Sequence, residues 1–353
     1  MKLAVISKPN DGCDYYRCVL PTQYMPFEKE DEVKIFTIPG YVVEHPLVDI
    51  IPNIDAFEPD IIFFNRTIAY AKSFDWLEAQ KKKGVKIVVD VDDYWELNPS
   101  HLMYNMWYKQ KLNEQVSKSL MLADVVFATN EKLRKHVLSL NKNCFIIPNA
   151  IPFGQPLFRQ ETPKNNVKMN FLYAAGVTHA PDVQILANKF DKLGGDPYVV
   201  KNAIFSLAGY NPSKADIHCP WDKMSSVFKR AKSYQILDTL PLEQHMRFYD
   251  SADVVLIPLV HNSFNECKSF LKVIEAASRE LPCICSSVYP YLELKDFPIM
   301  WDNWVENIRY CIKNPNFVKD QGKELAIKVK EQYHLGIWSQ VRYDIFKHLI
   351  KKA

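Results

Sequence analysis

The sequence lacks the features that mark membrane-spanning, disulfide-bonded and polyanion-binding proteins. None of its apolar runs approaches the roughly 18 to 20 residues that a membrane-spanning helix requires. The 8 cysteines show no C-x-x-C pair, and several lie in apolar stretches, so we infer neither zinc sites nor disulfides. A net charge of +3 is too small to require a polyanionic partner. We therefore expect a protein of the reducing cytoplasm without a transmembrane segment.

The chain of 353 residues is long for one domain and suffices for two, each with its own core. Short apolar stretches typical of buried parallel strands alternate with helical patterns in both halves. A polar, proline-containing stretch at 155–168 separates the halves as a linker. We predict an α/β protein of two doubly wound domains, over residues 1–160 and 166–335. The predicted strands cover residues 3–7, 33–37, 61–65, 85–89, 170–175, 205–208, 234–237, 254–259 and 283–285.

Residues 252–291 predict one strand, helix, strand unit of a parallel sheet, with a charged face on its helix. Lys268, Lys272 and Glu275 follow i, i+4, i+7 spacing and share that face. Unpaired amides at a helix start favour an anion, so two lysines beside them suit a diphosphate. The carboxylate suits the hydroxyls of a sugar. The alternative is a solvated face with a Lys–Glu pair.

A cluster of acids, Asp90, Asp92 and Asp93, follows the predicted strand 85–89. Carboxylates crowded at the carboxyl edge of a parallel sheet repel one another and need partners, so the cluster indicates a site. One interpretation is a D-x-D motif that holds Mg²⁺ or Mn²⁺, since these ions prefer oxygen ligands. The other interpretation is contact with a substrate hydroxyl, including help in removing its proton.

The stretch 252–291 resembles the donor-nucleotide signature of GT-B glycosyltransferases of the GT4 type. That signature is E-x7-E followed by a strand similar to G-L-P-V-I. Here Glu275 is the second acid and precedes the stretch 281–284, Leu-Pro-Cys-Ile. Cys267 stands at the position of the first acid, and Glu266 is displaced from it by one residue. The pattern N-x-x-K-S-x-x-K-x-x-E from Asn265 to Glu275 resembles a divergent subgroup from phage and bacterial genomes.

Two further stretches carry the resemblance. Residues 123–130 and 144–151 are similar to the A-D-x-V-x-x-x-S/T and V-I-P-N-G-V sequences that close the first domain of GT4-like proteins. Gly12, Tyr15, Tyr16 and Arg17 are similar to the subgroup's G-x-x-Y-Y-R-x-x-x-P segment. From the residues alone, Arg17 either meets an acceptor or phosphate, or pairs with a nearby acid.

The resemblance implies a GT-B fold, in which two Rossmann-like domains face a central cleft. The first would bind the acceptor and be completed by a C-terminal helix at 336–353; the second would bind the nucleotide sugar. A metal-binding D-x-D motif belongs to GT-A enzymes, which lack a second Rossmann-like half, so the resemblance favours contact with the acceptor, and we expect no metal or other cofactor. The implied activity is that of a hexosyltransferase (EC 2.4) that uses a UDP- or GDP-sugar and retains anomeric configuration.

The resemblance also assigns roles to individual residues. The predicted donor-binding residues are Gly176, Thr178, His179, Pro241, Glu266, Lys268, Ser269, Phe270, Lys272 and Glu275. The predicted acceptor-binding residues are Gly12, Tyr16, Arg17, Asp90, Asp92 and Asp93. The predicted catalytic residues are Asp92, Asp93, Lys268 and Lys272.

The acceptor and two other activities stay open at this point. An envelope glycan, a protein and a hydroxymethylated base of phage DNA are all compatible acceptors, and a phage-encoded enzyme would act in the host cytoplasm. A non-hydrolysing sugar-nucleotide epimerase shares the two-domain plan. A sugar-nucleotide-binding protein without turnover is the alternative outside enzymes, because the first acid of the signature and a nearby Arg are missing.

Overall fold

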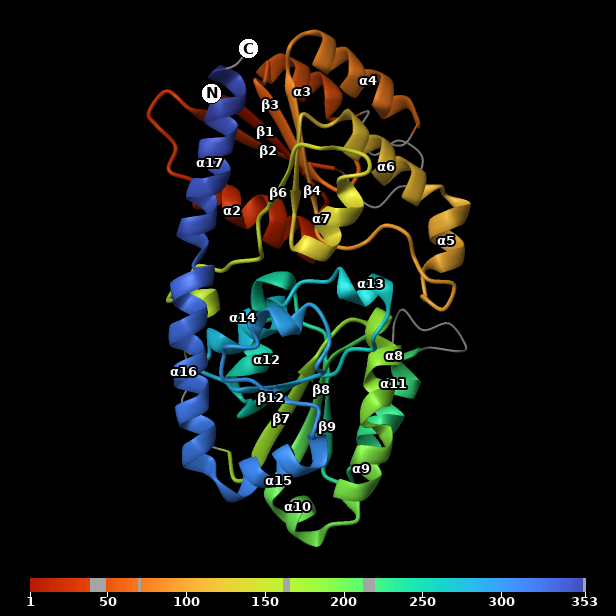
Figure 1. The fold of residues 1–353 in the computed structure, drawn as a ribbon, viewed down its shortest axis with the longest axis vertical. Coiled ribbons are helices and arrows are strands. Elements are labelled where there is room, and N and C mark those ends of the chain that lie inside the picture. The colour runs from red at the N-terminus through yellow and green to blue at the C-terminus, as the bar shows by residue number, and fades with distance from the viewer. Residues whose placement is uncertain (39–48, 69–70, 161–165, 212–219, 352–353) are drawn as a thin grey trace. The chain divides into compact units, whose positions relative to one another are not determined.

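The computed structural model describes residues 1–38, 49–68, 71–160, 166–211 and 220–351, which form two compact units (Figure 1). The first unit comprises Met1–Ala150, Glu266–Ser269 and Tyr333–Ala353. The second comprises Ile151–Asn265 and Phe270–Gln332. These boundaries differ from the predicted ranges 1–160 and 166–335. Within the described residues, no helix is long and apolar enough to cross a membrane.

The first unit is built on a six-stranded sheet of order β2-β1-β3-β4-β5-β6, in which every neighbouring pair is parallel. Its strands are β1 (Lys2–Ser7), β2 (Glu32–Thr37), β3 (Ile61–Asn65), β4 (Lys86–Val91), β5 (Val125–Ala128) and β6 (Cys144–Ile146). Its helices are α1 (Gly12–Asp14), a π-helix (Tyr15–Val19), α2 (Leu20–Gln23), α3 (Ile51–Phe57), α4 (Ala71–Lys82), α5 (Tyr104–Lys109), α6 (Leu112–Leu122), α7 (Glu131–Val137) and α17 (Leu335–Lys351).

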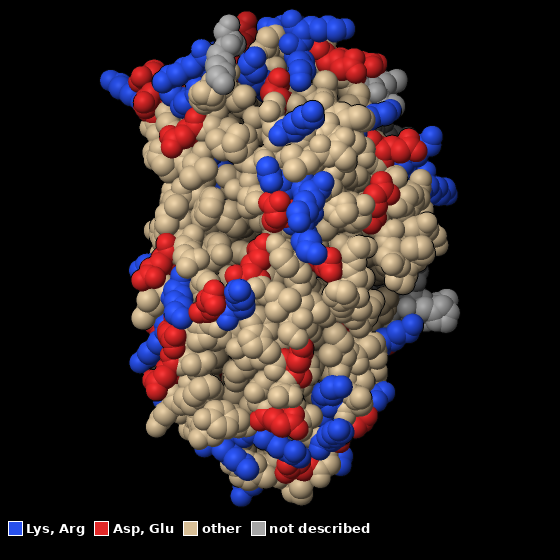
Figure 2. Space-filling view, in the orientation of Figure 1, with Lys and Arg blue, Asp and Glu red and all other residues tan. Residues whose placement is uncertain are grey.

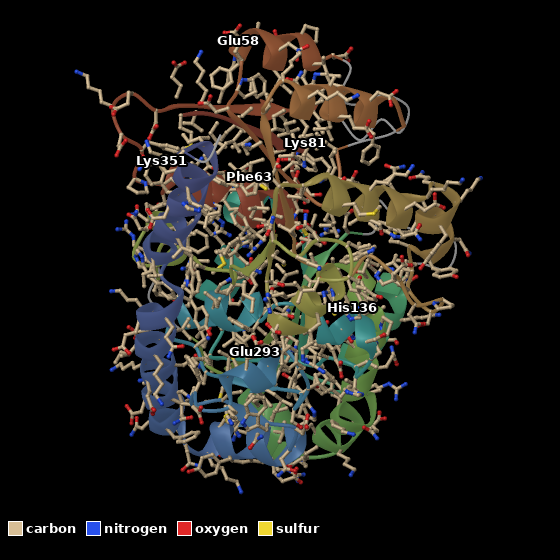
Figure 3. All side chains as sticks on the ribbon, turned by 45° about the horizontal axis from the view of Figure 1, so that its top comes forward. Glu58, Phe63, Lys81, His136, Glu293 and Lys351 are labelled. Atoms are coloured by element: carbon tan, nitrogen blue, oxygen red, sulfur yellow. The ribbon has the colours of Figure 1, made fainter. Side chains whose placement is uncertain are left out.

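Both faces of this sheet are covered, which explains why its central strands carry apolar residues on both faces. Alternate residues point to opposite faces, so Phe64 packs in one core while Phe63 packs in the other. Phe63 lies inside the unit (Figure 3), with its ring 5.4 Å from that of Phe346 on α17 and 6.0 Å from that of Phe127. Helix α17 thus covers one face, and α3, α4 and α6 lie on the other (Figure 1).

The second unit repeats the plan with a parallel sheet of order β12-β11-β10-β7-β8-β9. Its strands are β7 (Met169–Ala174), β8 (Ala203–Tyr210), β9 (Tyr234–Asp238), β10 (Val254–Ile257), β11 (Cys283–Cys285) and β12 (Met300–Trp301). Its helices are α8 (Ala180–Val183), α9 (Ala187–Gly194), α10 (Pro197–Asn202), α11 (Pro220–Lys229), α12 (Arg247–Asp250), α13 (Ser263–Glu266, whose last residue belongs to the first unit), α14 (Leu271–Ala277), α15 (Trp304–Lys313) and α16 (Pro315–Tyr333).

The core of the second unit packs aromatic side chains between its sheet and helices. Phe190 on α9 lies with its ring 4.7 Å from that of Phe205 on β8 and 5.2 Å from that of Phe228 on α11. On the visible surface, acidic and basic side chains are interspersed (Figure 2). The predicted α/β fold with two doubly wound parallel sheets is confirmed.

One local prediction is wrong: the helix expected after β10 is broken. Helix α13 ends at Glu266 and α14 begins at Leu271, so Lys268 lies between helices and does not share a helical face with Lys272 and Glu275. The side-chain amide of Asn130 donates hydrogen bonds to the carbonyls of Cys267 (3.0 Å) and Lys268 (2.9 Å). These bonds stabilise the intervening backbone in a non-helical path.

Candidate functional site

The second unit places His179 and Asp182 just after the carboxyl end of β7. Asp182 Oδ2 lies 2.7 Å from His179 Nδ1, while Asp182 Oδ1 accepts bonds from the Val260 amide (2.8 Å) and Asn265 Nδ2 (3.2 Å). Burial raises the pKa of Asp182, but His179 and the Val260 amide lower it by a larger amount. The pKa of Asp182 therefore lies below its usual value. Asp182 is therefore a carboxylate that accepts the Nδ1 proton of His179. This leaves His179 Nε2 as an acceptor.

The acceptor nitrogen of His179 faces Lys272 on α14. Lys272 Nζ lies 3.4 Å from His179 Nε2 and 5.9 Å from the centre of the Tyr173 ring, which favours a cation. Strands β7 and β10 are parallel neighbours, so the segments after them meet at one sheet edge. Asp182, His179 and Lys272 thus form a hydrogen-bonded row there.

Two other predicted donor residues lie next to His179. Gly176 and Thr178 are exposed, and a Cβ atom built on Gly176 would meet no atom within 4 Å. The space beside Gly176 is therefore open, as close approach of a ligand to the backbone requires.

Glu275 is buried on α14 and held through both carboxylate oxygens. The Tyr249 hydroxyl donates to Oε2 at 2.8 Å, and His245 Nε2 lies 3.3 Å from Oε1. Burial lowers the pKa of His245, but Glu275 and the Leu242 carbonyl outweigh it and raise that pKa above its usual value. His245 and Tyr249 fix the carboxylate, since each of them contacts one of its two oxygens.

Sequence reasoning missed His245 and Tyr249, which belong to no motif that it identified. It placed Pro241 at the donor site; Pro241 precedes Leu242, whose carbonyl contacts His245 Nδ1. Phe270 is buried and is the N-cap residue of α14, and its donor role stays a prediction.

The short segment Glu266–Ser269 belongs to the first unit. Glu266 pairs with Lys132 (3.2 Å), Lys268 Nζ lies 3.4 Å from Asp93 Oδ1, and Ser269 Oγ accepts a bond from Asn149 Nδ2 (2.6 Å). The structure thus places Lys268 with the acidic cluster, not in a row with Lys272. Cys267, at the position of the missing acid, packs in the apolar core. Burial raises the pKa of its thiol to about 12.

Arg17 and Asp90 form a buried ion pair in the first unit. Arg17 donates to both carboxylate oxygens of Asp90, at 2.7 and 2.9 Å, and also to Asn149 Oδ1 and the Ile147 carbonyl. The two side chains are 1% and 0% exposed. These buried side chains have no surface that an acceptor could reach, so their predicted direct contact with an acceptor does not fit this geometry. Their hydrogen bonds hold neighbouring segments of the first unit together.

Asp92 is bound by Arg66, which sequence reasoning also missed. Arg66 Nε lies 2.8 Å from Asp92 Oδ1, and its Nη2 contacts Cys13 Sγ at 2.8 Å and Asp93 Oδ2 at 3.8 Å. Burial raises the pKa of Asp92, but Arg66 outweighs this and holds it well below its usual range. Arg66 adopts a left-handed backbone with φ of 55°, which is costly for a residue with a side chain. Such strain is typical of functional positions.

Gly12 and Tyr16 lie on the segment after β1. Gly12 is exposed and opens α1, whereas Tyr16 is buried and packs edge-on against Tyr15. Nearby, burial raises the pKa of Asp14 to about 6, although Lys8 Nζ lies 2.8 Å from its carboxylate. Of this segment, Gly12 is positioned at the surface and Tyr16 is not.

Three or more His, Cys, Asp or Glu side chains do not gather as a set of metal ligands anywhere in the described part of the chain. In particular, Asp90 and Asp92 each pair with a different arginine. The carboxylate oxygens of Asp90 and Asp92 thus bind guanidinium groups.

The fold and these two clusters define a class: the chain has the GT-B fold, as predicted. It resembles sucrose-phosphate synthase from Thermosynechococcus elongatus at a TM-score of 0.71 and 12% identity, covering 100% of both chains. It resembles Anabaena HepE in complex with UDP-glucose at a TM-score of 0.66 and 12% identity, again covering 100% of both. A UDP-forming α,α-trehalose-phosphate synthase from Burkholderia xenovorans gives 0.63 and 10%, over 99% of this chain and 98% of that one.

These identities establish the fold alone. No protein-family model matches the sequence, and no curated protein does.

Proposed function

We propose that the protein is a glycosyltransferase that moves a sugar from a nucleotide-sugar donor to an acceptor hydroxyl. The observation that carries the proposal is the arrangement at the edge of the second sheet. There the row Asp182, His179, Lys272 and the fixed carboxylate of Glu275 come from neighbouring segments that follow parallel strands. One cation, Lys272, and one carboxylate, Glu275, on the same short helix suit a diphosphate next to a ribose.

Each of these residues has a role in the proposal. Lys272 stabilises the negative charge that develops on the leaving diphosphate, and the open space beside Gly176 admits its oxygens. Glu275 accepts hydrogen bonds from the ribose hydroxyls. The similarity to a structure solved with UDP-glucose favours a UDP-sugar over a GDP-sugar as donor. We expect retention of anomeric configuration and no requirement for a divalent metal.

We assign the acceptor to the acidic cluster of the first unit. Asp93 keeps 27% of its side chain exposed and contacts Lys268 and Arg66. Arg66 lowers the pKa of Asp92 and makes it a weak base, so Asp92 orients the cluster. Asp93 is more exposed, at 27% against 11%, and is the group that an acceptor hydroxyl reaches. An envelope glycan, a protein or a hydroxymethylated phage DNA base would serve as acceptor, and action in the cytoplasm follows from such donors.

Incubation with UDP- and GDP-sugars distinguishes this proposal from the two others. Transfer or slow hydrolysis of the sugar supports the transferase, inversion at C2 supports an epimerase, and saturable binding without product supports a binding protein. A chain that neither binds nor converts any of these donors contradicts all three.

The donor site is tested by measuring UDP affinity calorimetrically. Lys272→Ala and Glu275→Ala should each weaken binding by about 1.5 to 3 kcal/mol, or roughly 10- to 150-fold, as loss of a charged hydrogen bond does. Lys192→Ala, an exposed lysine of the same unit, is the matched control. Unchanged affinity in both site variants would refute this placement of the donor.

Asp182→Asn tests the row itself. Loss of the carboxylate removes the partner of His179 Nδ1, so UDP affinity should fall about tenfold. In a double-mutant cycle with Lys272→Ala, the two losses should not add, because the residues act through one row. Additive losses would show that Asp182 acts independently of Lys272.

A further inference from the structure

The second unit contains a cavity of about 710 Å³ that shares no residue with the proposed donor site. It lies between the loop 153–160, the carboxyl end of α14 and one face of α16. Its volume is within the range of small-molecule sites, about 300 to 1,000 Å³. Size alone therefore permits an organic ligand.

The charge of the lining is one-sided. Of the described lining residues, five are basic, namely Arg159, Arg279, Lys319, Lys323 and Lys330, and Glu280 alone is acidic. The whole chain is nearly balanced, with 44 basic and 41 acidic residues. The excess at the cavity therefore reflects local placement, and it selects for an anion.

Three of these cations stand on one face of α16. Lys319, Lys323 and Lys330 are exposed and form no ion pair with any residue that the structure describes. Like charges at i and i+4 destabilise a helix by a few tenths of a kcal/mol, which applies to Lys319 and Lys323. On another face of the same helix, Lys328 pairs with Glu324 at 3.3 Å. On this helix, Glu324 thus neutralises a lysine away from the cavity, whereas the charges of the three lysines at the cavity can bind an anionic ligand.

The remaining lining adds a fixed cation and apolar surface. Arg279 is buried, pairs with Asp250 at 2.7 Å and donates to the Leu157 carbonyl at 2.8 Å, so its position is set before any ligand arrives. Ile327, between the lysines, exposes 60% of its surface, and Phe153 is half-buried nearby. A ligand here would meet both cations and an apolar wall.

We propose that this cavity binds an organic phosphate with at least two negative charges and an apolar portion. Lys319 and Lys323 lie four residues apart, or about 6 Å along the helix, so one phosphate can contact both. A phosphate carries close to two charges and accepts bonds from several lysines. Its source is either a soluble phosphorylated compound or the headgroup of an anionic phospholipid.

Acetylation of lysines by an amine-reactive reagent, followed by mass spectrometry of the full chain, tests the site directly. Pyrophosphate represents the soluble source. Vesicles of phosphatidylcholine with or without phosphatidic acid, whose phosphomonoester carries close to two charges, represent the lipid source. Labelling of Lys319, Lys323 and Lys330 should fall about fivefold when a probe is present well above its Kd. Lys192, Lys201 and Lys229, which are exposed elsewhere in the unit, should keep their labelling.

A charge-matched pair of variants completes the experiment. The triple substitution Lys319→Gln/Lys323→Gln/Lys330→Gln should abolish vesicle co-sedimentation, or remove one of the two pyrophosphate binding events that calorimetry detects, whereas Lys192→Gln/Lys201→Gln/Lys229→Gln should do neither. Protection by pyrophosphate identifies a soluble ligand, and protection by phosphatidic acid vesicles alone identifies a lipid headgroup. Protection by neither probe, or equal protection of the control lysines, overturns the proposal. Because each lysine is read separately, pyrophosphate bound near Lys272 does not affect the result.

Discussion

Replacing Asp90 by Asn would leave the Arg17 guanidinium buried without its counter-charge. Asp90 is 0% exposed and accepts two hydrogen bonds from Arg17, which is 1% exposed. A second guanidinium, Arg342 of α17, is also buried, and its Nε has no partner among the described residues. Burial and the charge of Arg17 together lower the pKa of Arg342 to about 9, although Asp90 opposes both effects. Asp90 is therefore the carboxylate on which two buried cations depend.

Breaking a buried pair by removing one partner costs about 3 to 5 kcal/mol. For a unit of this size, each kcal/mol lowers the melting temperature by about 2 to 4 °C, so the loss should be roughly 6 to 20 °C. Differential scanning calorimetry resolves the transition of the first unit. Asp75→Asn, at an exposed site of the same unit, should change stability by less than about 0.5 kcal/mol.

A second variant separates the charge effect from simple misfolding. The double substitution Arg17→Met/Asp90→Leu removes both charges of the pair and should recover the part of the stability that Asp90→Asn loses through Arg17, because apolar replacements of buried pairs are often neutral. The part that depends on Arg342 should stay lost, since Arg342 keeps its buried charge. A melting temperature of Asp90→Asn within about 2 °C of that of Asp75→Asn would refute the reasoning, since the buried guanidinium would then not depend on the charge of Asp90.

Two more predictions concern the second unit. Because the pKa of His245 is raised, its bond to Glu275 stabilises the fold fully below the ordinary imidazole pKa of about 6.5, and this stabilisation is lost as pH rises through the folded pKa. In urea titrations, His245→Gln should therefore reduce the free energy of unfolding more at pH 6 than at pH 8. The exposed control His348→Gln should show no such difference. Gly322→Ala would place a Cβ atom 1.9 Å from the Glu280 carbonyl oxygen and should lower the free energy of unfolding by about 1 to 3 kcal/mol or more. Gly195→Ala, whose Cβ atom has its nearest contact at 3.5 Å, should be tolerated. Equal melting temperatures of the two variants would contradict the close packing at Gly322.

The sheets were predictable because strands buried on both faces carry near-continuous apolar runs, as in β5 and β10. The break after Glu266 was not predictable, because it depends on Asn130, which bonds to carbonyls 137 and 138 residues away. A helical pattern in the sequence carries no information about such a partner.

The candidate site shows the same division. Glu275 and Lys272 were found through a motif, since their spacing on one helix is a local property. Tyr249, His245 and Arg66 were not, because their roles arise only when separate loops meet at a sheet edge. For Arg66, an arginine directly after a buried strand was the one available signal, and its backbone strain appears only in three dimensions.

The first unit is assembled from three pieces of chain, and this has a consequence for the order in which it is made. Its sheet is complete by Ile146, yet the apolar face that holds Phe63 and Phe127 is covered by Phe346. A ribosome must therefore add about 200 further residues, including the second unit, before that face is shielded; at about 5 to 20 residues per second, this takes at least 10 seconds. During that interval the nascent first unit exposes an apolar face of its sheet, which chaperones can bind, and the second unit can complete its own fold first.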